Sequence, residues 1–269
     1  MSDIPLGRET AYPDTYAPDV LAPIPRADAR ATLGISDPLP FDGVDIWNAW
    51  ELTWLAPSGR PVTATLEIHV PATSTNIVES KSLKLYLNSF SMTEYDGPAD
   101  IESLIRTDLS SVTGAPVSLD LQTGAPQASN LDTLPGHCLD ELEVTCQFDH
   151  VDPATLGTKD GGIVEETLHT HLLRSLCPVT SQPDFGSLLV AYRGRPINRE
   201  GLLQYVASFR RHNDFHEACV ERMFVDIRER CSCEHLSVYA RYNRRGGIDI
   251  NPWRSDTSTT PKNLRLWRQ

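Results

Sequence analysis

The sequence has 269 residues, of which 40% are hydrophobic and 22% are charged, and this excludes short disulfide-stapled folds and extensive disorder. The net charge is -12, but residues 1–160 hold 8 Lys and Arg against 24 Asp and Glu, whereas residues 161–269 hold 16 against 12. This balance disfavours nucleic acid as a partner, although the arginine-rich second half can still hold a phosphorylated small molecule.

No apolar run approaches the roughly 18 residues that span a bilayer, and the first residues lack the pattern of a secretion signal. We therefore expect a cytoplasmic protein without a membrane partner. Disulfides are typical of secreted chains, so the cysteines are expected to be free thiols. They are Cys138, Cys146, Cys177, Cys219, Cys231 and Cys233.

Residues 1–45 are rich in Pro and Asp and show no hydrophobic period, which predicts an extended arm. From there to residue 155, hydrophobic spacing of period 2 or 3.6 predicts a first module of strands and helices in the order ββααββ. The predicted elements are strands at 51–55 and 62–70, helices at 79–90 and 100–111, and strands at 117–121 and 142–148.

The same order recurs in residues 156–269, so we expect an α+β fold of two tandem ββααββ modules with antiparallel sheets and helices on one face. The other sheet face then remains for another module or subunit, and a homo-oligomer is expected. The predicted elements are strands at 163–173 and 187–192, helices at 202–209 and 220–227, and strands at 236–242 and 247–250.

Common motifs for phosphate and metal binding are absent from the sequence: it has no GxGxxG, no GxxxxGK[ST] and no HExxH. Residues 231–235 (CSCEH) could bind a metal, but their spacing is unusual, and buried or surface thiols are the alternative. We predict no metal site.

A Pro-bounded loop between two predicted strands holds Cys177 and Asp184. A thiolate attacks polarised carbon, and a carboxyl group with a raised pKa can supply the proton that the attacked group needs. The alternative is a packing cysteine and an aspartate that stabilises a turn.

Residues 212–217 (HNDFHE) precede a predicted helix, where Asp214 could cap and Glu217 could complete a capping-box pair. Alternatively, Glu217 accepts the N–H donors of a guanine-like or pterin-like ring.

Residues 79–86 open a helix with Glu79, Lys81 and Lys84, and residues 244–247 (RRGG) form a basic turn. Both could be solvated surface. Lysines on one helix face and an Arg-Gly turn could instead meet the phosphates of a cofactor.

Four motifs in this order resemble the NADPH-dependent 7-cyano-7-deazaguanine reductases, the nitrile reductases of queuosine biosynthesis. The resemblance covers about residues 39–254 in the long two-module form. The motifs are ESKSLKLYLNSF (79–90), CPVTSQPDFG (177–186), FHE (215–217) and YARYNRRGG (239–247).

The resemblance implies a tunnelling fold like that of GTP cyclohydrolase I, and reduction of the nitrile to the amine with two NADPH per turnover and no metal. It implies that Cys177 forms a covalent thioimide and that Asp184 protonates the nitrogen. The substrate would be held by Ile77, Val78, Glu79, His216 and Glu217, and NADPH by Ser80, Lys81, Arg245 and Gly246.

No loop like that of Cys177 and Asp184 occurs in the first module, so we expect one active site per chain, in a homodimer or higher homo-oligomer. A protective disulfide between Cys177 and Cys219 is a further hypothesis. The alternatives are a hydrolase of the cyclohydrolase type and a non-catalytic module that binds purines or pterins.

Overall fold

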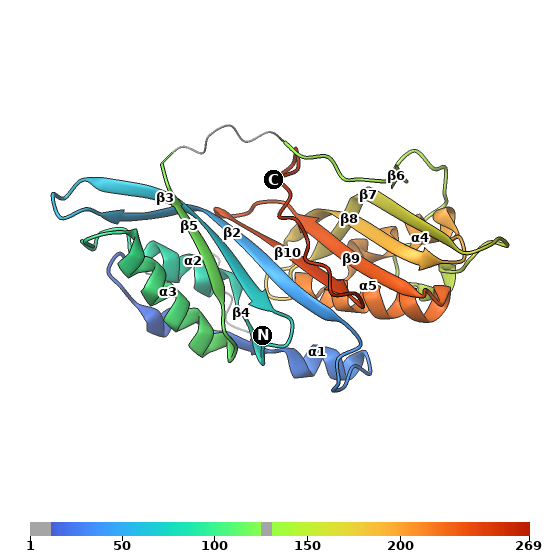
Figure 1. The fold of residues 1–269 in the computed structure, drawn as a ribbon, viewed down its shortest axis with the longest axis horizontal. Helices are drawn as coiled ribbons and strands as arrows, with labels where there is room; N and C mark the ends of the chain where they lie inside the picture. The colour runs from blue at the N-terminus through green and yellow to red at the C-terminus, as the bar shows by residue number, and fades with distance from the viewer. Residues whose placement is uncertain (1–11, 125–130) are drawn as a thin grey trace. The chain divides into compact units, whose positions relative to one another are not determined.

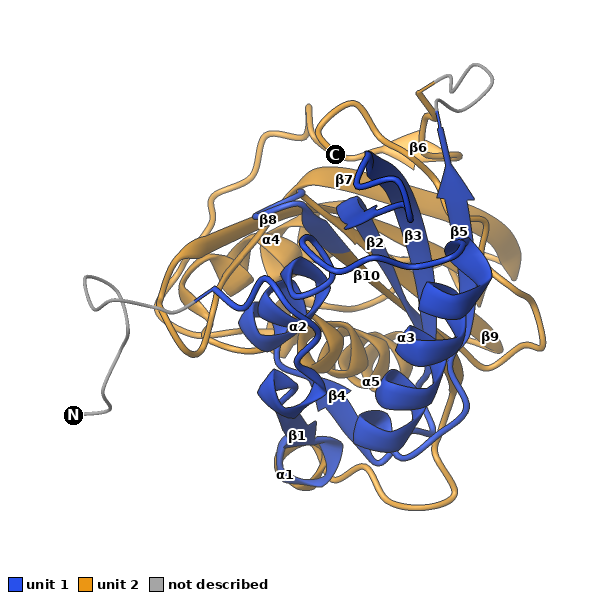
Figure 2. Cartoon of the chain, turned by 90° about the vertical axis from the view of Figure 1, so that its left-hand side faces the viewer, with its two compact units in different colours: residues 1–29, 45–129, 244–249 blue, residues 30–44, 130–243, 250–269 orange. Residues whose placement is uncertain are grey.

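The computed structural model describes residues 12–124 and 131–269. Contacts between Cα atoms divide the chain into two compact units that alternate along the sequence (Figure 2). Unit 1 comprises residues 1–29, 45–129 and 244–249, and unit 2 comprises residues 30–44, 130–243 and 250–269. The module boundaries at residues 45 and 155 stay a prediction, because a contact-based unit need not be continuous in sequence.

Unit 1 is built on the strands β2 (Asp42–Leu55), β3 (Pro61–Pro71) and β5 (Ser118–Thr123), with β3 in the middle. Every second residue of β3 is buried, as alternation requires when a sheet covers a core on one face. The helices α2 (Ser80–Asn88) and α3 (Pro98–Thr113) lie on that face (Figure 1). These elements confirm the predicted hairpin, both helices and the strand at 117–121.

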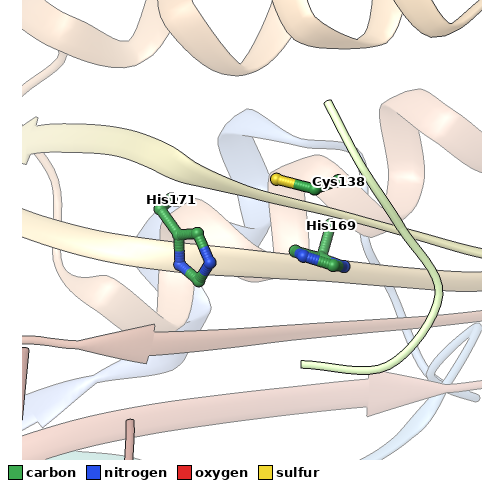
Figure 3. A group of neighbouring side chains, drawn as sticks. All are labelled: Cys138, His169 and His171. Carbon is green, nitrogen blue, oxygen red and sulfur yellow. The ribbon is translucent and has the colours of Figure 1, made fainter. Parts of the chain in front are cut away.

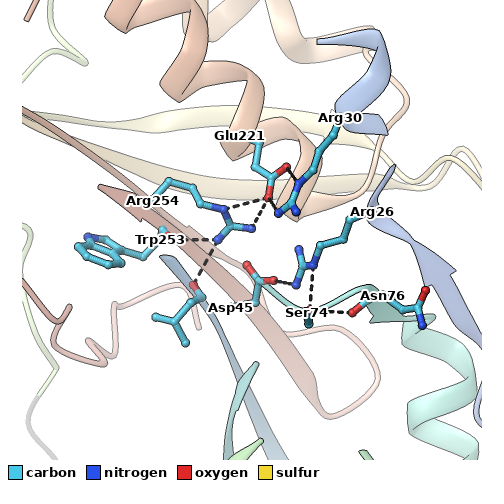
Figure 4. Close-up of polar contacts among 9 residues, drawn as sticks. Arg26, Arg30, Asp45, Ser74, Asn76, Glu221, Trp253 and Arg254 are labelled. Carbon is cyan, nitrogen blue, oxygen red and sulfur yellow. Dashed lines mark hydrogen bonds and ion pairs between the residues drawn. The ribbon is translucent and has the colours of Figure 1, made fainter. Parts of the chain in front are cut away.

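The N-terminal arm is more structured than predicted. It contains a 3-10 turn η1 (Pro18–Val20), a strand β1 (Pro23–Pro25) and a helix α1 (Arg26–Thr32), and β1 pairs antiparallel with β4 (Asn76–Val78). In unit 1 the buried Arg26 contacts Asp45 at 2.5 Å and donates from Nε to Ser74 Oγ at 3.0 Å (Figure 4). The prediction of an extended arm was wrong because these stabilising partners lie far away in the sequence.

Unit 2 has a sheet in the strand order β10-β9-β8-β7-β6. The antiparallel register of β7 with β8 and of β8 with β9 confirms the antiparallel expectation, and α4 and α5 complete the predicted second ββααββ order. Its elements are β6 (His137–Cys138), η2 (Pro153–Thr155), β7 (Val164–Leu176), β8 (Pro183–Gly194), α4 (Arg199–Ser208), η3 (Phe209–Arg211), α5 (His216–Cys231), β9 (His235–Tyr242) and β10 (Ile248–Ser255).

The prediction of a strand at residues 142–148 was wrong. Exposure does alternate from Leu142 to Cys146, but the segment belongs to no strand. Its backbone is contacted instead by a helix side chain, since Gln204 Nε2 on α4 donates to the Thr145 carbonyl at 3.0 Å. Alternation marks two faces, but a strand also needs a neighbouring strand to hydrogen-bond with.

A second buried ion cluster stabilises unit 2. Glu221 on α5 binds Arg30 at 2.7 Å and Arg254 on β10 at 2.9 Å (Figure 4). The Arg254 side chain is fully buried, and its Nη1 also donates to the Trp253 carbonyl at 2.9 Å. Among the described residues, no helix has the length and apolar character needed to cross a membrane.

Candidate active site

Cys177 and Asp184 lie at the turn between β7 and β8. Cys177 directly follows β7, its N–H donates to the Gln182 carbonyl at 2.9 Å, and its own carbonyl accepts from Ser181 N–H at 2.9 Å. Cys177, half-buried at the start of the turn, is two residues beyond Ser175, whose register partner Asp184 is only 7% exposed.

The start of α5 is held beside this turn by backbone hydrogen bonds. Leu176 N–H donates to the His212 carbonyl at 2.8 Å, and Asp214 N–H donates to the Leu176 carbonyl at 3.1 Å. These bonds place the first turn of α5, with the buried Glu217, near the residue that precedes Cys177. The structure thus brings together site residues of the second module that are 30 to 40 positions apart.

The capping-box interpretation of Asp214 and Glu217 was wrong. The helix begins one residue later than that interpretation requires: Phe215 is the N-cap and no side chain caps it. Asp214 instead accepts from Phe215 N–H at 2.8 Å. Glu217 therefore lies in the first turn, where the positive end of the helix dipole favours a carboxylate.

His216 links the acid to an aromatic ring. Its Nε2 lies 3.3 Å from Asp184 Oδ2, and its ring stacks on Tyr242, with 3.7 Å between centroids and 9° between planes. Tyr242 is the site residue that the sequence analysis did not single out. It belongs to a recognised motif, but no spacing rule connects it with a histidine 26 positions earlier.

Burial dominates the electrostatics around this pair. The pKa of Tyr242 is raised well above its usual value by burial, with the neighbouring Cys219 and Asp184 adding to the shift. Burial, followed by the charge of Asp214, likewise raises the pKa of Cys219. Cys177 and Cys219 are both reduced here, and Cys219 is fully buried, so their proposed disulfide stays a hypothesis.

In unit 1, Glu79 is the N-cap of α2, and its carboxylate accepts from Lys81 N–H at 2.9 Å and Ser82 N–H at 2.7 Å. Ile77 and Val78 lie on β4, with buried side chains and backbones paired with β1. The helix-end interpretation of Glu79 is thus confirmed. A carboxylate offers about four lone-pair positions, so capping leaves room for ligand donors.

The turn that holds Gly246 lies beside Lys84 of α2 in unit 1. Residues 245–248 form a tight turn in which Gly246 and Gly247 have positive φ angles of 61° and 80°. A Cβ atom on Gly246 would lie 3.2 Å from Lys84 Cδ, one helical turn from Lys81. The Arg244 guanidinium lies over the Trp50 ring, 5.5 Å from its centroid. Glycine therefore lets a basic turn approach the cationic start of α2, which suits phosphate groups.

Comparisons with known proteins identify the family of this chain. Residues 12–121 match the family model described as "Nitrile reductase, 7-cyano-7-deazaguanine-reductase N-term", and residues 183–261 match "QueF-like protein". Proteins named "NADPH-dependent 7-cyano-7-deazaguanine reductase" from Bordetella avium (strain 197N) and Dechloromonas aromatica (strain RCB) are 50% and 51% identical. The alignments cover 100% and 98% of this chain, and 99% and 95% of the relatives.

A solved structure titled "Crystal structure of the archaeosine synthase QueF-Like in the apo form" aligns with 38% of this chain and 100% of its own. Its identity is 17% and its TM-score is 0.31. At that level the alignment supports no conclusion about this site.

Proposed function

The chain belongs to the family of NADPH-dependent 7-cyano-7-deazaguanine reductases, and we propose that it reduces the nitrile of 7-cyano-7-deazaguanine to the primary amine of 7-aminomethyl-7-deazaguanine, in queuosine biosynthesis. The observation that carries the proposal is the buried Asp184, 3.3 Å from His216 and two residues beyond Gln182, whose carbonyl accepts from the Cys177 N–H. A nucleophile and a proton donor on one rigid hairpin suit addition to a polarised triple bond.

In the first step, the Cys177 sulfur forms a bond to the nitrile carbon while Asp184 gives a proton to the nitrogen. The thiol proton passes to the Asp184–His216 pair and replaces the proton that Asp184 has given up, so the net change is addition of S–H across the triple bond and the product is a neutral covalent thioimide. His216 acts on Asp184: its Nε2 holds the carboxyl group in place and exchanges a proton with it, while stacking on Tyr242 fixes the imidazole plane. Cys177 leaves as a thiol once the carbon has been reduced.

Recognition of the deazaguanine ring is assigned to carboxylates and backbone groups. Glu217, 3% exposed in the first turn of α5, accepts N–H donors of the ring. We assign the same recognition role to Glu79 and to the backbone of Ile77 and Val78, with His216 positioning the ring. Burial supports the role of Glu217, because a buried carboxylate has no water to replace a missing hydrogen bond, so a ligand group that does not donate one binds poorly.

The residues of unit 1 fit the phosphates of NADPH. Gly246 has no side chain, so the space beside Lys84 that a Cβ atom would fill stays open, and the neighbouring groups are cationic. Ser80, Lys81, Arg245 and Gly246 would hold these phosphates. Bound NADPH supplies hydride, and two NADPH are consumed because four electrons are needed. We expect Lys81→Ala to raise the KM for NADPH about tenfold, because one charge-assisted contact of roughly 1.5 kcal/mol is lost. The control is Lys159→Ala, which removes a lysine from an exposed ion pair and should leave this KM unchanged.

The proposal includes a reaction without a metal, a cytoplasmic location, a homodimer, and no nucleic-acid or membrane partner. The acidic net charge of -12 supports the absence of a polynucleotide partner. Light scattering during size exclusion tests the dimer, and a monomeric mass at working concentration would refute it.

The test of the mechanism is the intact mass of the protein after mixing with 7-cyano-7-deazaguanine without NADPH. Wild type and Cys146→Ala, which removes another half-buried thiol, should gain the mass of the substrate, whereas Cys177→Ala should not. Adding NADPH should discharge the adduct and release the amine.

Turnover by Cys177→Ala would refute the covalent mechanism. Substrate binding without any turnover in wild type would favour the binding-module alternative. Zinc-dependent hydrolysis of a purine-like ring would favour the cyclohydrolase alternative.

A further inference from the structure

Unit 2 contains a cluster of metal-ligating side chains that the proposed reaction does not use. Cys138, His169 and His171 each offer one ligand atom, and these atoms all lie within 4.8 Å of one another (Figure 3). A tetrahedral zinc ion with bonds of about 2.0–2.3 Å holds two ligand atoms about 3.3–3.8 Å apart. Side-chain rotations that shorten the widest separation by about 1 Å therefore close the cluster around one ion.

The strand pairing explains why these three residues meet. β6 pairs in parallel with β7, with Cys138 opposite His169. His171 is two residues further along β7, where the register with β8 shifts between Thr170 and Leu173. The rings are 5.5 Å apart between centroids. A sequence separation of 31 residues between Cys138 and His169 hides this set from motif searches.

Hydrogen bonds hold each imidazole by its Nδ1 atom. His169 Nδ1 lies 2.9 Å from the Pro135 carbonyl, and His171 Nδ1 lies 2.8 Å from Ser187 Oγ. A carbonyl oxygen can only accept, so His169 Nδ1 carries the proton and Nε2 keeps its lone pair. Metal-bound histidines are commonly oriented by such a bond from the second ring nitrogen.

The surroundings also fix the loop that carries the thiol. Asp140, two residues after Cys138, accepts from Thr170 Oγ1 at 2.6 Å and from His171 N–H at 3.0 Å. Cys138 itself is exposed and His169 is 9% exposed. An ion can thus reach the thiol from solvent, and the imidazoles lie behind it.

We propose that Cys138, His169 and His171 form a Zn²⁺ site that ties the irregular segment around β6 to β7, apart from the proposed reaction. One thiolate with two imidazoles is a borderline-soft donor set that suits Zn²⁺ and not Mg²⁺ or Ca²⁺. Three protein ligands leave the fourth position to water. The site would stabilise β6, which has only two residues and pairs weakly without a further link.

The test is to equilibrate the purified full-length protein with Zn²⁺, remove loose metal by gel filtration, and measure bound zinc by mass spectrometry. Wild type should retain one equivalent. Cys138→Ser and His169→Gln should each retain less than a tenth of that amount. The thiol controls Cys146→Ser and Cys177→Ala should bind like wild type, which distinguishes this site from capture by other free thiols.

Co²⁺ substitution gives a second measurement, since thiolate–cobalt charge transfer absorbs only when sulfur is a ligand. That absorption should be present in wild type and absent in Cys138→Ser, while unchanged circular dichroism shows that the variant is folded. No retained zinc in wild type would overturn the proposal. Equal zinc in wild type and Cys138→Ser would overturn it as well.

Discussion

Glu221 provides the sharpest test of what stabilises unit 2. Its carboxylate is 3% exposed and lies between two guanidinium groups, those of Arg30, 11% exposed, and Arg254, 0% exposed. Arg30 donates from Nε and Nη2 at 2.9 and 2.7 Å, and Arg254 donates from the same two atoms at 3.1 and 2.9 Å. Glu221→Gln keeps the shape but removes the negative charge between two cations.

Breaking a buried ion pair from one side costs about 3–5 kcal/mol, because the remaining charge is left without compensation. For a chain of this size, each kcal/mol lowers Tm by roughly 2–4 °C, so we expect a decrease of about 6–20 °C. Thermal unfolding followed by circular dichroism measures this shift. Glu234→Gln is the matched control, since its pair with Arg193 is about half exposed and should contribute roughly 0–1 kcal/mol.

A double variant separates lost charge compensation from lost packing. Glu221→Met/Arg254→Met removes the most buried cation together with the anion, so it should be more stable than Glu221→Met alone. A Tm of Glu221→Gln within about 2 °C of wild type would refute the reasoning, as would a double variant less stable than the single one.

Two further predictions concern local packing and acid stability. Gly201→Ala should lower the free energy of unfolding by about 1–3 kcal/mol, because the added Cβ would lie 2.1 Å from a backbone oxygen of η2. At Gly157 no atom lies within 4 Å of the added Cβ, so Gly157→Ala should leave that free energy nearly unchanged. Chemical unfolding measures both. Burial raises the pKa of Glu166, but hydrogen bonds from Tyr192 and Arg199 outweigh it, so the net pKa is lowered. The ionised Glu166 therefore contributes to folding stability above about pH 5, and this contribution is lost as the pH falls through the lowered pKa. Glu166→Gln removes the titrating group, so Tm should fall less steeply below about pH 5 in the variant than in wild type. An unchanged slope of Tm against pH would contradict this.

Local periodicity predicted most of the secondary structure. The hairpin of β2 and β3, the helices α2 to α5 and the strands β7 to β9 were all expected, since their hydrophobic residues recur along the chain at the period of a strand or a helix. The strand expected at 142–148 failed because alternation says nothing about a partner strand. The helix at Arg26–Thr32 was missed because a buried arginine is stabilised there by residues that are distant in sequence.

For the site, the sequence by itself supplied the loop of Cys177 and Asp184, the acidic start of α5 and the basic turn, because these motifs are contiguous and their residue types limit the chemistry. Only the tertiary structure decided which of them meet. It placed His216 against Asp184 and Tyr242, and it assembled Cys138 with two histidines of β7. Such contacts depend on strand register and helix packing, which are set by long-range burial and not by the spacing of neighbouring residues.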